Sequence, residues 1–325
     1  MALLCATMLA FAQTSTQTAL LKHGNNITSY YGADAFIEAH AAATAGDIIT
    51  LSSGTFNAPD ITKAITLRGV GCVSDGEQNL QPTSITGTVI TNITDTINHL
   101  TVEGIYFDYV FSFDSLIDPV FIRCNFERIQ WHRDTWTTLM RNPQFINCRM
   151  RYFNTYRIDN ITLQNCIIWD FRNGFNAGWA YEHIYAYNSY LNLANSFHNL
   201  YTYNSIVIGD RNGMCDQSVA YHTIGIGEIF MNCEHYNCWN YDNYDEVFES
   251  FTGEDYVWTT EPLILKDEIA NQCLGEDGTQ AGIYGGNMPY SARPTYMTPY
   301  RTTVGQHSTP EGKLNIHIEV IDGNK

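Results

Sequence analysis

The chain has 325 residues, of which 34 are acidic and 17 are basic, so its formal net charge at pH 7 is −17. This charge disfavours nucleic acid and anionic membrane surfaces as partners, because both are polyanions. The length suits one large repeat domain or two ordinary domains.

Residues 1–12 are predicted to be a signal peptide. A short apolar run ends in Ala10-Phe11-Ala12 before Gln13, which is an A-x-A cleavage pattern. The alternative is an ordinary apolar N-terminus, since the usual positively charged start is missing. No other run is long enough to span a bilayer. We therefore expect an exported protein of the extracellular space, cell surface or periplasm, and not an integral membrane protein.

A helix is predicted next, over Ala33–Ala43, where the residues have strong helix propensity. It is followed by the strand-like sequence IITL and by Ser53-Gly54-Thr55-Phe56. A helix placed before the first strands would cover the open end of a stack of strands, which would otherwise invite strand addition by other chains.

The central part of the chain contains nine similar short segments. They are Ile65–Val70, Thr83–Thr88, Leu100–Ile105, Pro119–Cys124, Pro143–Cys148, Ile161–Cys166, Ile184–Ser189, Leu200–Ser205 and Glu228–Cys233. In most of them, apolar residues stand five and three places before the last residue, and another follows two places after it. This alternation predicts strands with one buried face.

Each segment has a small or polar residue just before its last position, and in eight of nine this residue is Gly or Asn, as in Gly104 and Asn147. Gly and Asn tolerate a left-handed backbone best, so a sharp bend is predicted there. Stacked bends would let the Asn amides bond to one another. The last position, often Cys or Ser, would point inward, and its spacing from segment to segment is irregular. A β-sandwich with coincidental Gly and Asn turns is the alternative.

The order helix, AGDIITLSSGTF and then ITLRGVG resembles the beginning of the pectin-lyase-like, right-handed parallel β-helix superfamily. The Asn positions are similar to the Asn ladder of its pectate lyase members. This resemblance covers roughly residues 30–240 and implies an all-β fold, a right-handed parallel β-helix (solenoid) of nine to eleven coils with an N-terminal helical cap. It implies no single activity, because the superfamily includes lyases, hydrolases, esterases, tailspikes and adhesins.

Residues 241–325 are predicted to form a C-terminal loop and strand appendage, in which Leu314–Val320 alternates as a strand does. This tail resembles that of exported β-helix proteins of Gram-negative bacteria without assigned activity. The acidic stretch Tyr236–Trp258 is a candidate calcium site or, more simply, a solvated loop. We interpret Cys124, Cys148, Cys166 and Cys233 as small core residues, while pairing among Cys215, Cys238 and Cys273 stays open.

A third strand should follow each bend, with Val110, Ile129, Phe153, Phe171 and Ala194 facing inward. Its outward side chains would form one long face of aromatic, Arg, Asn and Asp groups. Such a face suits sugars, because aromatic rings stack on the apolar face of a sugar and forked donors reach its hydroxyls and carboxylates. The candidate binding residues are Arg128, His132, Tyr152, Asn154, Tyr156, Asp170, Arg172, Asn195 and Arg211. An ordinary polar surface is the alternative.

Catalysis is the less favoured prediction. In a polysaccharide lyase acting on acidic glycans, Arg172 or Arg211 could be the base and Asp170 or Asp210 a calcium ligand. The predicted face has too few carboxylates for a calcium cluster, and the clustered Asp residues of a polygalacturonase are absent. The leading hypothesis is thus a non-catalytic protein, without a cofactor, that binds a polysaccharide, surface glycan or other partner. An adhesin or structural role is the third hypothesis.

Overall fold

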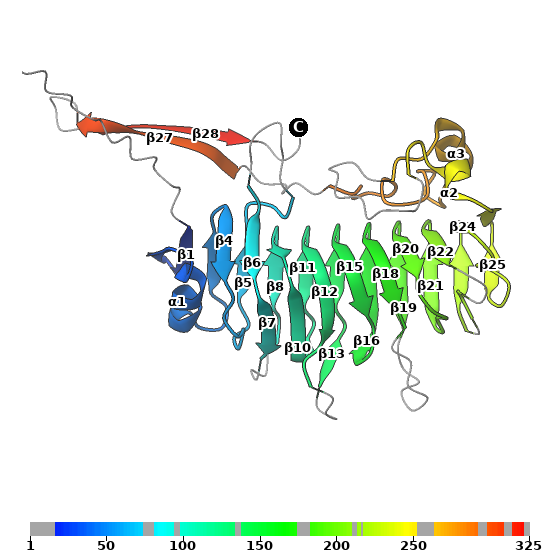
Figure 1. Ribbon diagram of the computed structural model, residues 1–325, viewed down its shortest axis with the longest axis horizontal. Coiled ribbons are helices and arrows are strands. Elements are labelled where there is room, and N and C mark those ends of the chain that lie inside the picture. Colours follow the sequence, from blue (N-terminus) through cyan, green and yellow to red (C-terminus); the bar gives the residue numbers. More distant parts are fainter. Residues whose placement is uncertain are drawn as a thin grey trace, which may run out of the picture.

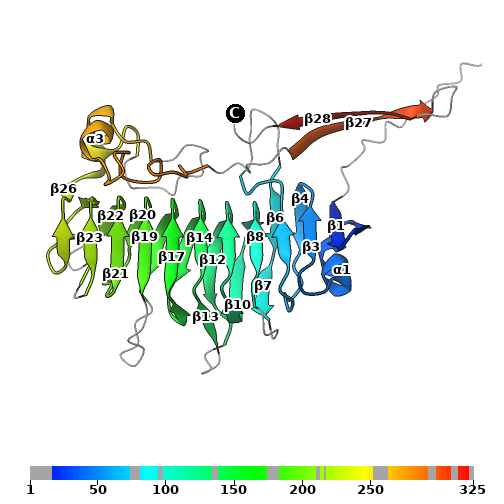
Figure 2. The ribbon, with the colours of Figure 1, turned by 180° about the vertical axis from the view of Figure 1, so that it is seen from behind.

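The computed structural model describes residues 17–73, 81–93, 98–133, 138–173, 183–209, 213–215, 217–251 and 263–291, together with the backbone of strands at 298–308 and 314–321. The predicted signal peptide therefore lies outside the described residues. About half of the described chain is β-strand, most of it in two long sheets whose strands lie side by side along the long axis of the molecule (Figures 1 and 2).

The first sheet begins with the antiparallel strands β2 and β1 and continues in parallel from β3 onward. Its order is β2 (Asn26–Tyr31), β1 (Thr18–His23), β3 (Ile48–Leu51), β5 (Thr66–Arg68), β8 (Thr101–Glu103), β11 (Val120–Ile122), β14 (Gln144–Ile146), β17 (Ile161–Gln164), β19 (Ile184–Tyr187), β21 (Leu200–Tyr203), β23 (Val219–Tyr221) and β25 (Glu234–Tyr236).

The second sheet is parallel throughout its described pairs. Its strands are β4 (Gly54–Asn57), β6 (Thr83–Thr86), β7 (Thr88–Asn92), β9 (Tyr106–Phe107), β10 (Val110–Ile117), β12 (Asn125–Trp131), β13 (Leu139–Arg141), β15 (Arg149–Asn154), β16 (Ile158–Asp159), β18 (Ile167–Arg172), β20 (Tyr190–Leu193), β22 (Ile206–Gly209), β24 (Ile224–Ile226) and β26 (Trp239–Tyr241). Successive repeats thus contribute one strand to the first sheet and one or two strands to the second, which is consistent with a parallel β-helix.

The predicted bends are confirmed from Gly104 to Asn204. Asn147, Asn165, Asn188 and Asn204 all have φ between 49° and 55°, in the left-handed region where Asn is tolerated. The predicted ladder of amide bonds is not formed there. The Asn165 side chain instead donates to the carbonyls of Ile283 and Gly285, each at 2.9 Å, because the C-terminal part of the chain lies against it.

The residues after the bends face the interior, as predicted. Cys124, Cys148, Cys166, Ser189 and Ser205 are fully buried. Their thiols and hydroxyls bond to carbonyls of the preceding repeat, as Cys166 does to Phe145 at 3.2 Å. Burial raises the pKa of the Cys124 and Cys148 thiols well above its usual value, so these thiols stay neutral. The cysteines that the structure describes, among them Cys215, Cys238 and Cys273, form no disulfide.

Two of the nine predicted segments are wrong. The segment Thr83–Thr88 contains β6 and β7 of the second sheet, and the first sheet passes directly from β5 to β8. The sequence of this segment resembles the repeat because its residues also alternate and because its backbone also bends at a glycine, Gly87, with φ 89°.

The segment Glu228–Cys233 is a turn, in which Ile229 is fully buried in the main core. The true repeats here are β23 and β25, with bends at His222 and Asn237. Cys233 is consequently only half-buried, and Cys238 stands in the position that sequence reasoning gave to Cys233.

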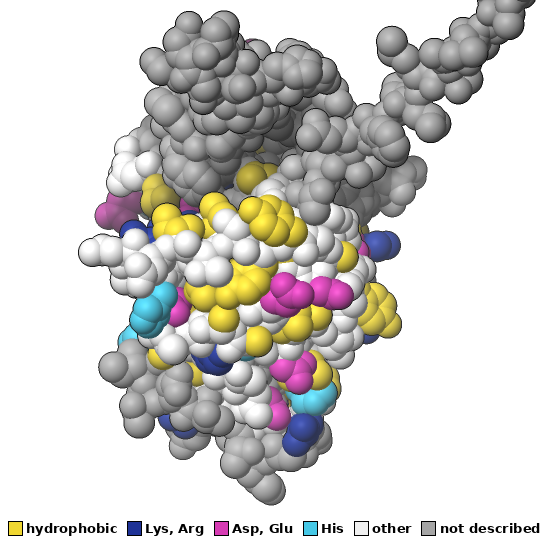
Figure 3. All heavy atoms as spheres, turned by 90° about the vertical axis from the view of Figure 1, so that its left-hand side faces the viewer, with side chains coloured by type: hydrophobic (Ala, Val, Ile, Leu, Met, Phe, Trp, Pro, Cys, Tyr) yellow, Lys and Arg dark blue, Asp and Glu magenta, His cyan; other side chains and the backbone are white. Residues whose placement is uncertain are grey.

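The N-terminal helix is confirmed as α1 (Ala35–Ala42), with Phe36 and Ala39 fully buried against the first strands. Figure 3 looks onto this end of the stack, where hydrophobic and acidic side chains are mixed on the surface, and Ile27 and Tyr31 are each 65% exposed. Within the described chain, no helix has the length and apolar character needed to cross a bilayer.

The predicted C-terminal strand is confirmed as β28 (Leu314–Ile321), which pairs antiparallel with β27 (Thr298–Ser308). Before this hairpin come the short helices α2 (Tyr244–Val247) and α3 (Asp267–Gln272). Residues 263–291, here called the cover segment, pack on the outer face of β20, β22 and β24. There Ile206, Ile208 and Ile224 contact a second hydrophobic cluster that contains Ile269 and Ile283.

Candidate functional site

The strands of the second sheet change direction at a pair of consecutive outward residues. In β12, Phe126 and Ile129 are both fully buried, which leaves Glu127 and Arg128 between them facing out. In β15 the outward pair is Arg151–Tyr152, and in β18 it is Trp169–Asp170. A spacing of three between buried residues, rather than two, therefore produces a corner with two outward side chains.

These corners stack into an open groove with a volume of about 600 Å³. Arg128 pairs in register with Tyr152, and Tyr152 with Asp170, so the predicted neighbours do lie together. The groove is lined by Asp108, Tyr109, Val110, Glu127, Arg128, Arg151, Tyr152, Trp169 and Asp170. Aromatic, cationic and acidic groups thus meet on one surface.

Tyr152 stands between two guanidinium groups. The Cζ atom of Arg128 lies 4.6 Å from the centre of the Tyr152 ring, and that of Arg172 lies 5.2 Å from it. Both distances are within the range of cation–π attraction. Arg128 is exposed, and no carboxylate in the described ranges forms an ion pair with it.

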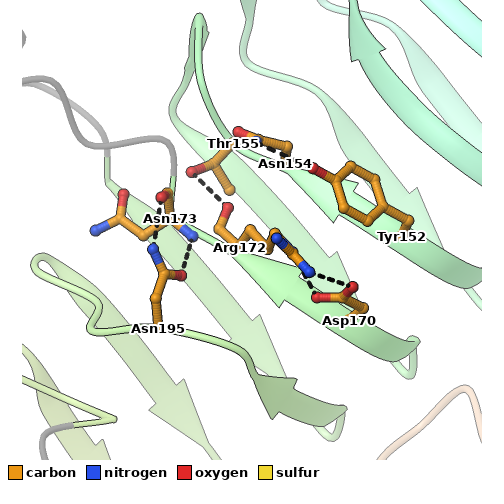
Figure 4. Close-up of polar contacts among 7 residues, drawn as sticks. All are labelled: Tyr152, Asn154, Thr155, Asp170, Arg172, Asn173 and Asn195. Atoms are coloured by element: carbon orange, nitrogen blue, oxygen red, sulfur yellow. Dashed lines mark hydrogen bonds and ion pairs between the residues drawn. The ribbon is translucent and has the colours of Figure 1, made fainter.

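Arg172 forms an ion pair with a residue of its own strand. Its Nε and Nη2 atoms donate to the two carboxylate oxygens of Asp170 at 2.9 and 3.0 Å, as Figure 4 shows. The hydrogen bonds and charge of Asp170 raise the pKa of Arg172 above its usual value. An arginine that acts as a base must lose its proton, so this pair works against the catalytic role considered for Arg172 and occupies Asp170 as well.

Glu127 and Arg151 are among the groove residues that sequence reasoning missed, as are Asp108 and Trp169. The Tyr106 hydroxyl donates to Glu127 Oε1 at 2.9 Å, and Arg151 Nη1 donates to Glu127 Oε2 at 3.1 Å. The signal was present, because Phe126 and Ile129 were both expected to face inward. Two residues, not one, must then lie outside.

Asn154, Tyr156 and His132 lie beyond the residues that line the groove. Asn154 Oδ1 accepts the backbone N–H of Tyr156 at 2.9 Å, and the Tyr156 ring packs edge-on against Trp131 with ring centres 4.8 Å apart. His132 is half-buried, and its backbone N–H donates to Phe113. We assign these side chains to the turn that follows the groove strands.

The prediction that Ala194 faces inward is wrong, since Leu193 is buried and Ala194 is exposed. Two residues separate Ile168 from Phe171 in β18, but only one separates Leu191 from Leu193 in β20, so a register shift brings Phe171 opposite Leu193. Asn195 therefore lies past the end of the strand. Its side chain exchanges hydrogen bonds with the backbone of Asn173 at 2.8 and 2.9 Å, away from Asp170 (Figure 4).

The remaining predicted site residues, Arg211 and Asp210, lie outside the described residues. Among the described residues there is no group of three or more His, Cys, Asp or Glu side chains placed to hold a metal ion. The acidic stretch predicted as a candidate calcium site is described only as far as residue 251.

Two of the three groove carboxylates, Glu127 and Asp170, are held by arginines, while Arg128 and the ring of Tyr109, which is 61% exposed, face solvent. Comparison of the chain with family models, with curated proteins and with solved structures found no match.

Proposed function

We propose that this chain is an exported, right-handed parallel β-helix protein of the pectin-lyase-like superfamily that binds carbohydrate in the groove without catalysis. One observation carries the proposal. Arg128 is an exposed guanidinium held over the Tyr152 ring, at an open groove, and none of the described carboxylates neutralises it.

Each group of the groove has a role in this proposal. The Arg128 fork donates to hydroxyls or to a carboxylate of the sugar, and such charge-assisted bonds are the strong ones. The exposed ring of Tyr109 packs against the apolar face of a sugar. Asp108 lines the same groove, so its carboxylate is a further acceptor for a sugar hydroxyl.

A glycan array followed by titration calorimetry on the best ligand tests the proposal. We expect Arg128→Ala to weaken binding about 10- to 100-fold, because a hydrogen bond to a charged group contributes about 1.5–3 kcal/mol. Arg141→Ala is the matched control, since Arg141 is also an exposed strand residue but lies on β13, away from the groove. Equal losses in the two variants, or no retention of any glycan, would contradict carbohydrate binding, and the second result would favour an adhesin or structural role.

A polysaccharide lyase acting on acidic glycans is the second hypothesis from the sequence. The ion pair that holds Arg172 protonated counts against it. Incubation with pectate, alginate and glycosaminoglycans, monitored by the ultraviolet absorbance of unsaturated products, is expected to give a flat trace. Product formation by the parent protein that is lost in Arg172→Ala would support the lyase hypothesis.

A further inference from the structure

A second surface, on the other sheet, carries six tyrosines in two rows. The strands β19, β21, β23 and β25 alternate between inward and outward residues, and the tyrosines occupy the outward positions. One row is Tyr187, Tyr203, Tyr221 and Tyr236, and the other is Tyr185 and Tyr201. We call these six residues the tyrosine platform.

The rings of the platform stack from strand to strand. In the long row, neighbouring ring centres are 5.0, 5.2 and 5.1 Å apart, with interplanar angles of 13°, 8° and 14°. In the short row, Tyr185 and Tyr201 are 5.1 Å apart. The end rings of the long row remain exposed, Tyr187 to 38% and Tyr236 to 48%. The rows thus present rings and hydroxyls at the spacing of the strands.

The outward positions of four neighbouring strands of this sheet carry no full charge. The outward residues of β17, β19, β21 and β23 are Thr162, Gln164, Tyr185, Tyr187, Tyr201, Tyr203, Val219 and Tyr221. The first acidic side chain, Glu234, stands on β25, where its carboxylate accepts the Tyr236 hydroxyl at 3.1 Å. In a chain of net charge −17, such an uncharged face is a local exception.

Aromatic residues at these positions are confined to one end of the sheet. On β11 and β14 the corresponding outward residues are Val120 and Ile122, and Gln144 and Ile146. These strands pair in the same parallel register without tyrosine. Sheet formation alone therefore does not require the platform, although stacked cross-strand rings do stabilise it by about 0.2–1 kcal/mol per pair.

We propose that the tyrosine platform is a second carbohydrate site, which takes an extended, uncharged β-linked glycan lying along the rows. A sugar chain in this direction meets a new ring about every 4.8 Å, the separation of neighbouring strands, which is close to the length of one pyranose unit. Because neighbouring rings cover one another's faces, the ligand meets the ring edges and the phenol hydroxyls, which bond to the hydroxyl groups of the pyranoses.

The charges select this ligand over the alternatives. An acidic glycan would find no cation on the platform to pair with its carboxylates. A second copy of the chain also has a net charge of −17, so the two copies repel each other. Burial, together with the neighbouring tyrosines, raises the pKa of Tyr187 and Tyr203, so their hydroxyls remain protonated donors at neutral pH.

The test is depletion of the full-length protein from solution by microcrystalline cellulose and by chitin, with soluble pectate as a competitor. We expect binding to at least one solid that pectate does not displace. Replacement of Tyr187, Tyr203 and Tyr221 together by Thr, a strand-forming residue, should reduce the bound fraction at least tenfold. The control variant Val120→Thr with Ile122→Thr, on β11 of the same sheet, should bind like the parent protein.

Circular dichroism shows whether the triple variant folds. If it does not, the end variants Tyr187→Thr and Tyr236→Thr decide, because these rings are the most exposed in the row. Each should weaken retention at least threefold. Unchanged retention, no retention of the parent protein by either solid, or a platform-dependent dimer in sedimentation would overturn the proposal.

Discussion

The outer face of the second sheet differs between its two halves. Over β12, β15 and β18 it is charged and open, with Arg128, Tyr152 and Asp170 along a groove. Over β20, β22 and β24 it is apolar and lies beneath the cover segment, through residues such as Ile206 and Ile208. Both halves are built from the same repeat with the same parallel pairing.

The difference arises from a single residue per strand. In the first half, two outward residues separate the buried ones, as Arg151 and Tyr152 separate Met150 from Phe153. In β20 a single residue, Asn192, separates Leu191 from Leu193. The corner and its second side chain are lost, and the strand becomes flat enough to be covered. We infer that the groove ends where this shortening begins.

The interiors of the two halves differ as well, and this gives the largest predicted effect. Phe145 is fully buried and lies 4.9 Å from Phe121 and 5.3 Å from Phe153, measured between ring centres. We expect Phe145→Ala to lower the free energy of unfolding by about 3–5 kcal/mol, since it leaves a cavity that the stacked rings cannot fill. Urea denaturation measures this. Phe145→Leu is the control, and a loss below about 1 kcal/mol in the Ala variant would show that the interior repacks.

The second prediction removes the cover from the second half. Ile206 is buried and packs next to Gly282 of the cover segment. Ile206→Asp would place an unpaired charge in this interface, which costs about 3–5 kcal/mol. Hydrogen exchange should then show fast exchange in residues 263–291 while β12 and β15 stay protected. Ile122→Asp, on a half-buried outward position of the other sheet, should have a much smaller effect, and equal effects would argue against a specific cover.

Much of the repeat was predictable because it depends on local rules. Asn147 and Asn165 mark the bends through their tolerance of a left-handed backbone, and Cys148 and Cys166 then fall inside. The same rules also gave a wrong prediction. Ile229, in the turn at 228–233, is buried at a position where the alternation predicts an inward strand residue. Pattern alone does not separate a buried turn from a buried strand.

The two faces of the second half were not predictable for a related reason. Ile206, Val207 and Ile208 are consecutive apolar residues, so alternation does not show that the two isoleucines face outward. Only the cover segment, which is distant in sequence, explains them. In the groove, by contrast, Arg128, Tyr152 and Asp170 were placed together correctly. Their contacts with Arg172, Glu127 and Arg151 depend on side-chain directions at the corner, which no periodicity specifies.

The third prediction concerns the cap, which adjoins the first half. Burial, and to a lesser extent the charge of Lys63, lowers the pKa of His40 from 6.5 to about 4, with Asp60 opposing. Its Nε2 accepts the backbone N–H of Thr62 at 3.3 Å, which requires a neutral ring. Because the folded pKa is the lower one, the unfolded chain binds more protons between these values, and stability falls as the pH drops from 6.5 to 4.

We expect the loss to be about 2 kcal/mol, less than the full shift would give, because solvent screens groups near the surface. His40→Gln preserves an acceptor for Thr62 without titrating. The free energy of unfolding should therefore depend less on pH in the variant than in the parent protein over this range. Urea denaturation at pH 6.5 and pH 4.5 measures it. An unchanged slope would assign the acid sensitivity to other groups.

The smallest expected effect comes from undoing the shortening itself. Insertion of one Ser after Asn192 would restore two outward residues between Leu191 and Leu193, and would move the register shift from the β18–β20 pair to the β20–β22 pair. Since the number of irregular pairs stays the same, we expect stability to change by no more than about 1 kcal/mol. The same insertion after Ile208 should cost several times more, because Ile208 is buried beneath the cover segment. Urea denaturation compares the two. If both insertions were tolerated equally, strand length would not be what divides the open half from the covered one.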